Sequence, residues 1–246
     1  MPSFLDTISH QNPTDITNGP FQHANAMPNK SLYTYFGENT AMASRFGSMV
    51  QMYNAGKPFL WEDNFYPFES RILDPVPSSP TDVLLVDIGG GDANDLTRLR
   101  AALPPSTQGR LILQELPHIV ERSTQDGFEA MAYDWNEPQP IVGARAYLLH
   151  HILHDFASDD ACRVILKNIV AAMGEHSKLL VKDLMIPDKG APWAMTAMDV
   201  NVMQSLSGQE RTEGQMRALL GSVGLKVTGV WRHERALDVV VEAMLA

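Results

Sequence analysis

Apolar positions follow a helical repeat in the first quarter of the chain. From Ser31 to Ala55, apolar side chains recur three and four residues apart, which predicts two helices with a break near Gly37–Asn39. The preceding residues 1–30 are rich in Asn, Pro, Gly and Thr and show no period, so we expect a mobile arm there. These segments predict an N-terminal arm and helical cap over residues 1–75.

A second pattern begins after the proline-rich stretch Pro75–Pro80 and continues through residues 76–246. Short apolar runs there alternate with helical repeats. The predicted strands are 83–88, 110–114, 129–133, 145–149, 178–184, 226–231 and 237–243. The predicted helices are 94–102, 116–123, 159–173 and 213–222. This alternation predicts an α/β domain with a seven-stranded, mainly parallel sheet and helices on both faces. The short connection between the last two strands predicts an antiparallel edge strand.

Charge and cysteine content exclude several classes of protein. The chain has 29 acidic and 19 basic residues, a formal charge of −10, and no run of Lys or Arg. Nucleic acids and anionic membranes are therefore not expected partners. No apolar stretch reaches the roughly 20 residues that span a bilayer, and the N-terminus lacks the pattern of a secretory signal. The single cysteine, Cys162, fits a reducing compartment, so we expect a cytoplasmic protein.

Three glycines stand where the first predicted strand turns into a helix. Asp87 lies near the end of that strand, and Gly89, Gly90 and Gly91 follow it. Glycines at this place let the backbone approach a ligand at the carboxyl edge of a parallel sheet. The spacing departs from the G-x-G-x-x-G fingerprint of dinucleotide sites, because Asn94 stands where the last glycine would be.

Acidic residues also end the next two predicted strands. Glu115 ends the second strand, where a carboxylate accepts hydrogen bonds from the ribose hydroxyls of a nucleoside. Asp134 and Trp135 follow the third strand and offer a carboxylate to an adenine amine and an aromatic face for stacking. No basic residue that would cradle a phosphate accompanies them. A nucleoside without phosphates therefore fits this edge better than NAD.

A histidine cluster follows the fourth predicted strand. His150 and His154 are four residues apart, but no cysteine or His-Glu signature accompanies them, so we expect no metal site. A purely structural role and a general base are the alternatives, since imidazole accepts a proton near neutral pH. A base of this kind is helped by a carboxylate that orients the ring, and Asp183 and Glu210 are the candidates.

The quoted segments together resemble the plant and fungal O-methyltransferases of the caffeic acid type, which use S-adenosylmethionine. The resemblance runs in family order through Val86–Gly91, Glu115–His118, Leu153–Phe156, Lys182–Pro187 and Gly208–Thr212. It implies a Rossmann-like class I methyltransferase fold over residues 76–246, with S-adenosylmethionine as the cofactor. The residues that it assigns to cofactor binding are Asp87, Gly89, Gly91, Glu115, Asp134, Trp135 and His150. It makes His154 the catalytic base and Asp183 and Glu210 its flanking acids.

Two departures from the family pattern affect the site, and a third affects assembly. Asp183 replaces the commoner glutamate, and His150 stands where many members have lysine or arginine. The winged-helix-like dimerisation domain that members carry before the catalytic part is not recognised in this sequence. We therefore expect a monomer, or a weak homodimer through the aromatic segment Phe59–Phe68, and a partner protein is an alternative.

The implied reaction is methyl transfer to a hydroxyl of a small aromatic or polyketide-like acceptor. The expected acceptor walls are aromatic residues and methionines: Phe46, Met49, Met52, Trp61, Phe65, Met198 and Met203. The same side chains fit an ordinary hydrophobic core or cap equally well. The alternatives in function are a relative that binds the cofactor but promotes a cyclisation, and a partner subunit without catalysis of its own. An NAD-dependent oxidoreductase is disfavoured by the glycine spacing.

Overall fold

A computed structural model describes residues 1–246 except 63–64, 76–78, 80, 122 and 124–126. Most of the proline-rich stretch after Pro75 therefore lies outside the described residues. The chain forms two compact units, each assembled from several stretches. The first unit comprises Met1–Lys57, His151–Cys162 and Leu184–Met216, and the second comprises Pro58–His150, Arg163–Asp183 and Arg217–Ala246. The predicted boundary near residue 75 divides the chain by position, whereas these units group residues that pack together, so that boundary stays a prediction.

After the first four helices the chain contains the strands of the sheet, and helices connect most of them. The α-helices are α1 Pro2–Thr7, α2 Pro20–Asn25, α3 Leu32–Glu38, α4 Thr40–Asn54, α5 Asn94–Ala102, α6 Pro117–Val120, α7 Asp159–Ala172, α8 Trp193–Leu206 and α9 Glu213–Gly221. The strands are β1 Val83–Ile88, β2 Arg110–Glu115, β3 Glu129–Ala132, β4 Ala146–His150, β5 Lys178–Leu184, β6 Leu225–Arg232 and β7 Asp238–Leu245. A π-helical turn, η1, covers Glu69–Leu73, and a 3₁₀ turn, η2, covers Leu153–Asp155. Among the described residues, no helix has the length and apolar character that a membrane crossing needs.

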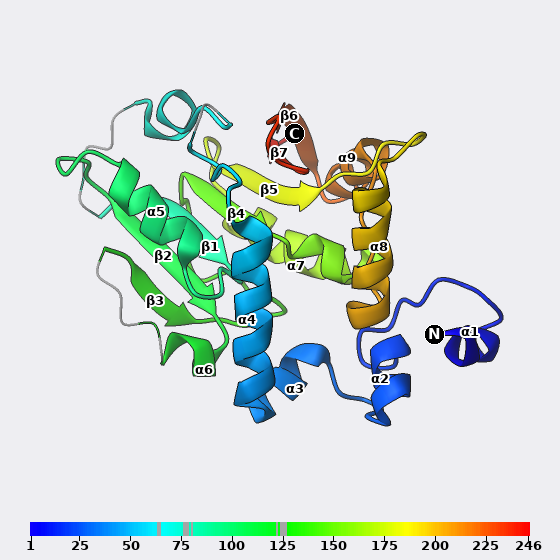
Figure 1. Cartoon of the computed structure of the whole chain (residues 1–246). Helices are drawn as coiled ribbons and strands as arrows, with labels where there is room; N and C mark the ends of the chain where they lie inside the picture. The colour runs from blue at the N-terminus through cyan, green and yellow to red at the C-terminus, as the bar shows by residue number, and fades with distance from the viewer. Residues whose placement is uncertain (63–64, 76–78, 80, 122, 124–126) are drawn as a thin grey trace. The chain divides into compact units, whose positions relative to one another are not determined.

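The second unit is built on a seven-stranded sheet with the order β3-β2-β1-β4-β5-β7-β6 (Figure 1). Parallel pairs join β1 to β2 and β4, β2 to β3, and β4 to β5. At the other edge β6 pairs antiparallel with β7. The predicted mainly parallel sheet with an antiparallel edge is confirmed. Because parallel strands end at a common edge, Asp87, Glu115 and His150 come from the carboxyl ends of neighbouring strands.

The central strands are continuous apolar runs because both of their faces are buried. Strands β1, β4 and β5 are almost entirely buried. Side chains of these strands join α5 and aromatic residues that precede β1 in a single hydrophobic cluster, which includes Leu60, Phe65, Tyr66, Phe68, Leu85, Leu96, Leu99, Leu148, Leu180 and Val240. The hydroxyl of Tyr66 donates to the buried carboxylate of Glu242 at 2.6 Å, which attaches the aromatic segment to β7.

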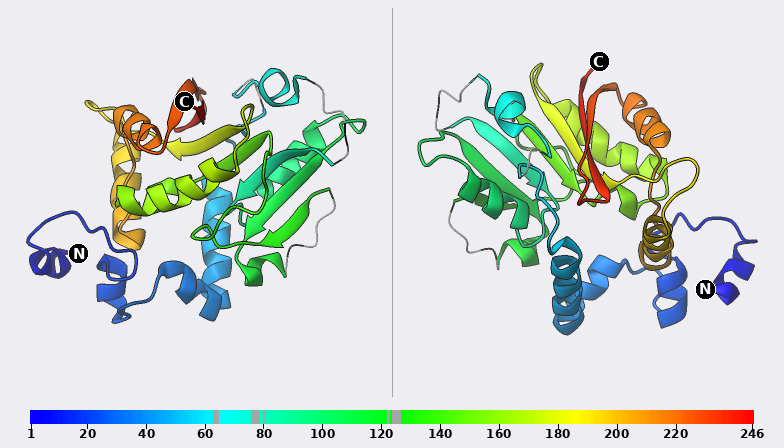
Figure 2. Two further views of the ribbon diagram at one scale, coloured as in Figure 1. Left: turned by 180° about the vertical axis from the view of Figure 1, so that it is seen from behind. Right: turned by 45° about the horizontal axis from the view of Figure 1, so that its top comes forward.

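Helices cover both faces of this sheet (Figures 1 and 2). The connection from β1 through α5 runs to β2, and the connection from β4 through α7 runs the opposite way along the sheet, to β5. Since crossovers between parallel strands are right-handed, the two helices fall on opposite faces. This arrangement leaves the carboxyl edge of the strands to the loops, which carry the candidate binding residues.

The first unit is helical and contains the N-terminal segment, η2 and α8. Residues 1–30, for which a mobile arm is predicted, contain the short helices α1 and α2. The buried side chain of Gln22 holds part of this segment together. Its amide donates to the carbonyls of Ile16 at 3.0 Å and Lys30 at 2.9 Å, and its oxygen accepts from the backbone N–H of Gly19 at 3.0 Å. One polar side chain thus satisfies several backbone groups of a segment that has no apolar period.

The two helices predicted between residues 31 and 55 are confirmed as α3 and α4. The break between them lies at Asn39, whose side-chain oxygen accepts from the backbone N–H of Met42 at 3.2 Å and caps α4. Helix α8, over Trp193–Leu206, was not predicted. Its methionines and valines are spread around the helix, so the sequence shows no apolar stripe of the kind that marks a surface helix.

Candidate functional site

The turn between β1 and α5 needs glycine for two separate reasons. Gly89 and Gly91 have φ angles of 74° and 56°, in the left-handed region that side chains disfavour. A Cβ at Gly90 would lie 2.3 Å from a carboxylate oxygen of Asp87, so the turn folds back directly over that side chain. The sequence therefore produces a glycine turn whose backbone a ligand can approach and which packs directly against the carboxyl group of Asp87.

Asp87 is a buried carboxyl group directly beneath this turn. Its side chain is 0% exposed, and neither carboxylate oxygen has a hydrogen-bond partner among the described residues. Burial is the main reason that the pKa of Asp87 lies well above its usual value, and the charges of Asp95 and Glu115 raise it further, while Lys182 opposes them. A buried carboxyl without a partner is costly. Such a group fits a place where a ligand supplies the missing hydrogen bond.

Glu115 lies next to the glycine turn, as the positions of the strand ends predict. Its Oε1 accepts from the backbone N–H of Gly91 at 3.3 Å, and its Oε2 accepts from the N–H of Leu116 at 2.5 Å. Burial raises the pKa of Glu115, and these backbone hydrogen bonds partly oppose the rise. Two residues predicted for the cofactor therefore contact each other at the carboxyl edge of the sheet.

His150 ends β4 and is held by an acid that the sequence analysis missed. Its Nδ1 lies 2.5 Å from Oδ2 of Asp95, which is buried in the first turn of α5. In the parallel pairing of β4 with β5, His150 is level with Lys182, a lysine that is itself buried. A signal for Lys182 was present in the sequence, because a charge within an apolar strand is as exceptional there as Asp87 is in β1.

Asp134 and Trp135 follow β3 as predicted, on the outer part of the site. Asp134 is exposed, and its Oδ1 accepts from the backbone N–H of Asn136 at 2.9 Å and from its side-chain amide at 2.8 Å. Trp135 is half-buried, and its carbonyl accepts from the side chain of Asn168 at 2.9 Å. Asp134 is thus held by the turn that follows β3, and the backbone of Trp135 is held by Asn168 of α7.

In the first unit, the structure joins His154 to one of its two predicted acids. His154 lies in η2, and its Nδ1 is 2.9 Å from Oε1 of Glu210. The Glu210 side chain is fully buried, and its backbone N–H donates to Oδ1 of Asp199 at 2.8 Å. A half-buried histidine and a buried glutamate from segments far apart in the sequence therefore face each other.

The second ring nitrogen of His154 faces an acid that the sequence analysis did not assign. Nε2 lies 3.3 Å from Oδ1 of Asp155, and the hydroxyl of Tyr33 donates a short hydrogen bond to the other oxygen of the same carboxylate. Burial raises the pKa of Asp155 to about 6, although His154 and Tyr33 lower it. Nothing in the sequence indicates Tyr33, because it lies more than a hundred residues before its partner.

His151 packs between two aromatic rings of the first unit. Its ring centroid is 4.8 Å from that of His154 and 5.7 Å from that of Tyr53. The backbone of His151 has a φ of 55°, which is uncommon for a residue with a side chain. The histidines at 150, 151 and 154 therefore have different surroundings: His150 faces Asp95, His151 lies beside Tyr53, and His154 faces Glu210.

Asp183 is buried near the end of β5, adjacent in the chain to Lys182. Because side chains alternate along a strand, Asp183 and Lys182 lie on opposite faces of the sheet. The contact between Asp183 and His154 that the family resemblance implies stays a prediction.

The predicted acceptor walls have different surroundings. In the second unit, Phe65 is 1% exposed within the hydrophobic cluster, and Trp61 packs against that cluster, so core packing describes both side chains as the structure has them. In the first unit, Phe46 of α4 stacks on Phe36 with ring centroids 4.8 Å apart, and Met49 is 49% exposed.

The remaining predicted walls lie on α8, beside the segment that carries Glu210. Met198 is half-buried, while Met203 lines a cavity of about 360 Å³ within the first unit. Asp199, Gln209 and Glu210 line the same cavity. Polar and apolar side chains thus share this space, which lies next to one member of the histidine–glutamate pair.

Comparison with known proteins gives the family. Residues 76–226, more than half of the chain, match the family described as O-methyltransferase domain. O-methyltransferase ucdC of Aspergillus ustus is 37% identical over 234 residues, which cover 95% of this chain and 59% of that protein. Among solved structures, one described as a pericyclic reaction enzyme matches with a TM-score of 0.87 and 30% identity, over 100% of this chain and 62% of that one. OxaC in complex with SAH and oxaline matches with a TM-score of 0.84 and 28% identity, over 100% and 61%.

The structural similarities agree with the seven-stranded α/β fold described above. The chain belongs to the O-methyltransferase domain family. It spans about 60% of the length of the proteins that it matches.

Proposed function

We propose that this chain is the catalytic part of an S-adenosylmethionine-dependent O-methyltransferase that acts on a hydroxyl of a small aromatic or polyketide-like molecule. The observation that carries the proposal is the pair of the half-buried His154 and the buried Glu210, whose facing atoms are 2.9 Å apart. Membership of the family and the similarity to OxaC, which was solved with SAH and oxaline, support it. SAH is the form of S-adenosylmethionine that has lost the methyl group.

The residues of the second unit suit this cofactor. The glycine turn leaves backbone exposed, and Glu115 beside it offers carboxylate oxygens for ribose hydroxyls. Asp87 supplies a buried acceptor without a partner among the described residues. Asp134, Trp135 and His150 are assigned to the rest of the cofactor by the family pattern. When bound, S-adenosylmethionine supplies an electrophilic methyl group.

His154 is assigned the removal of the acceptor proton. With Nδ1–H donating to Glu210, the free electron pair is on Nε2, which is the nitrogen that accepts a proton. The positive charge that then forms on the ring is stabilised by Glu210 and by Asp155, 3.3 Å from Nε2. A base of this kind contributes roughly 10² to 10⁴-fold to a rate. Asp183 is proposed as a further orienting acid on the family pattern alone.

The similarity to a pericyclic reaction enzyme favours one second candidate function. In that candidate the cofactor is bound but its methyl group is retained, and the protein promotes a cyclisation. His154 and Glu210 serve proton transfer in the first candidate and substrate orientation in the second.

Incubation with methyl-labelled S-adenosylmethionine and a panel of phenols and hydroxylated polyketides distinguishes these candidates. Transfer of label to an acceptor oxygen, with SAH formed in equal amount, supports the methyltransferase. Binding of SAH in calorimetry without label transfer to any acceptor, together with rearrangement of an unsaturated acceptor, supports the cyclisation. Absence of heat with both SAH and S-adenosylmethionine would overturn both candidates.

A further inference from the structure

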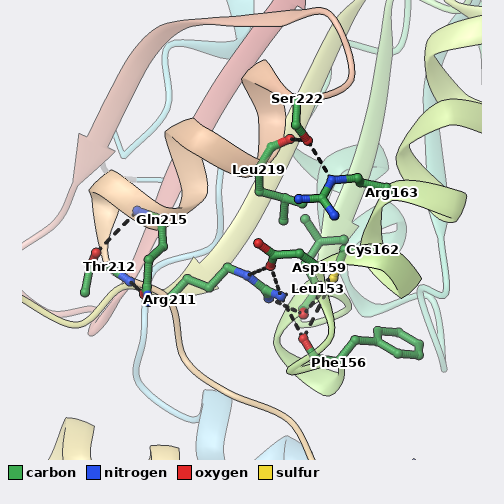
Figure 3. Close-up of polar contacts among 10 residues, drawn as sticks. All are labelled: Leu153, Phe156, Asp159, Cys162, Arg163, Arg211, Thr212, Gln215, Leu219 and Ser222. Atoms are coloured by element: carbon green, nitrogen blue, oxygen red, sulfur yellow. Dashed lines mark hydrogen bonds and ion pairs between the residues drawn. The ribbon is translucent and has the colours of Figure 1, made fainter. Parts of the chain in front are cut away.

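The structure contains a buried arginine whose donors are directed at the turn that carries His154. Arg211 is 2% exposed and directly follows Glu210 in the chain. Its Nη1 donates to the carbonyl of Leu153 at 2.7 Å, and its Nη2 donates to the carbonyl of Phe156 at 2.8 Å (Figure 3). Leu153 is the first residue of η2 and Phe156 directly follows the turn, so the two carbonyls flank His154 in sequence. One planar guanidinium therefore joins the beginning of this turn to its end.

The charge of Arg211 is balanced within the same group of residues. Nε and Nη2 donate to Oδ1 of Asp159 at 3.2 and 2.9 Å, and Nη2 also lies 3.4 Å from Sγ of Cys162 (Figure 3). A buried guanidinium is costly unless its donors are matched, and here backbone carbonyls and one carboxylate match them. A lysine at this position has a single nitrogen and lacks the rigid fork that reaches both carbonyls.

The backbone near Arg211 contacts the same turn. The N–H of Gln209 donates to the carbonyl of His154 at 2.9 Å, and the N–H of Ala157 donates to the carbonyl of Ser207 at 3.2 Å. A Cβ at Gly208 would lie 2.2 Å from the carbonyl oxygen of His154, so the two segments are in direct contact there. Glu210 thus contacts the ring of His154, while the residue after it fixes the backbone that carries that ring.

We infer that Arg211 is a positioning residue for His154: it fixes the 3₁₀ turn so that Nδ1 of the imidazole meets Glu210. The inference rests on the proposed function for its consequence in catalysis. Its structural consequence is independent of that function, because the environment of the imidazole is measurable without any substrate. Without the guanidinium of Arg211, η2 is free to shift. A shift of about 1 Å at a catalytic group costs on the order of 10²-fold in rate.

The test compares Arg211→Met and Arg211→Lys with the wild type by nitrogen NMR of the imidazoles. His154→Gln identifies the His154 signals, and Glu210→Gln shows their position when the Nδ1 partner is lost. In Arg211→Met we expect the His154 signals to move toward those in Glu210→Gln, with Arg211→Lys intermediate. Arg163→Met is the matched control. Arg163 donates to Oγ of Ser222 at 3.0 Å, both residues being in the second unit, and its loss should leave the His154 signals unchanged (Figure 3).

For methyl transfer we expect kcat of Arg211→Met to fall about 10- to 100-fold, with KM for donor and acceptor within about threefold. His154 signals and kcat equal to those of the wild type would overturn the inference. If Arg211→Met does not fold, the His154 signals of Asp159→Asn, which removes the carboxylate partner of Arg211, test the inference instead. A smaller shift in the same direction supports the inference, and unchanged signals contradict it. A wild type that transfers no methyl group, with His154 signals that still depend on Arg211, would remove the proposed function and leave the positioning role.

Discussion

At the scale of single residues, His154 differs from the neighbouring histidines in what its ring contacts. Nδ1 faces Glu210 and Nε2 faces Asp155, whereas His150 faces Asp95. We expect His154→Gln to lower kcat by about 10² to 10⁴-fold and to leave the affinity for SAH within a few-fold, because the lost group moves a proton and does not hold the cofactor. Rates with a panel acceptor and calorimetry with SAH measure the two effects.

His150→Ala is the companion variant for this prediction. It removes a residue assigned to the cofactor, so weaker SAH binding with a smaller loss of rate at saturating donor is expected. Near-normal methylation by His154→Gln across the pH range would contradict the role of His154 as the base. Transfer would then depend on positioning, or on an acceptor that is already ionised in solution.

Asp155 gives a second residue-scale prediction, which concerns stability. Because the pKa of Asp155 is raised to about 6 in the folded protein, the folded state holds its proton over a pH range in which the unfolded chain has lost it. Its contribution to stability therefore falls as the pH rises from about 4 to about 6 and is constant above that. The rise in the pKa of Asp155 from 3.8 to about 6 corresponds to about 3 kcal/mol in the free energy of unfolding.

Asp155→Asn removes this titration. The free energy of unfolding of the variant minus that of the wild type should therefore increase by up to about 3 kcal/mol between pH 4 and pH 7, because only the wild type loses stability over this range. Urea unfolding at several pH values measures the change. Asp188→Asn is the control, because Asp188 is exposed. A difference between Asp155→Asn and the wild type that is independent of pH would show that Asp155 does not titrate in this way.

The sequence allowed the site to be predicted where a residue is exceptional in its local pattern. Asp87 interrupts an apolar strand, and the glycines after it mark a turn, so both were found from the sequence. Glu210 was found as a partner of His154 through the family pattern. Tyr33 and Arg211 were not found, because their significance comes from contacts with a turn that is distant in sequence.

At the scale of elements, the contact between η2 and the segment after α8 depends on Gly208. A Cβ at this position would lie 2.2 Å from the carbonyl oxygen of His154 and 3.1 Å from Cα of Asp155. Both neighbours are backbone atoms, which cannot move aside as a flexible side chain does. Gly208→Ala should therefore lower the free energy of unfolding by about 1 to 3 kcal/mol and also lower kcat, since the strain acts on the turn of His154.

Gly221→Ala is the matched control for this variant. Gly221 ends α9, and a Cβ there meets no described atom within 4 Å. Alanine favours a helix over glycine, so this change should be neutral or stabilise by up to about 1 kcal/mol. Denaturant unfolding and rates with a single acceptor measure both variants. Equal stability of Gly208→Ala and the wild type would show that the two segments have room to separate.

The elements differ in how far the sequence determines them. The central strands were predicted closely because burial on both faces makes them continuous apolar runs. Helix α8 was missed because its apolar residues are not confined to one side, so the helical repeat is hidden. In the N-terminal segment, the side chain of Gln22 makes hydrogen bonds to the backbone of Ile16 and Lys30. A pattern of apolar positions does not reveal hydrogen bonds of this kind.

At the scale of the whole molecule, the two compact units are interleaved along the chain. The chain passes from one unit to the other five times, at the boundaries given by their residue ranges. A single cut therefore does not separate them, and global unfolding involves both. We expect one cooperative thermal transition, with residues of both units losing structure together.

Ligand binding tests this coupling through Glu115, which belongs to the second unit. A ligand that binds only the folded protein stabilises it by about 2.7 kcal/mol at a concentration of 100 times its Kd. SAH at that concentration should therefore raise the single transition temperature of the wild type. Glu115→Ala should lose most of this increase, because the acid beside the glycine turn is removed. Glu121→Ala, at an exposed position after α6, should keep it. Two separate transitions, of which only one responds to SAH, would show instead that the units unfold independently and that binding is confined energetically to the second unit.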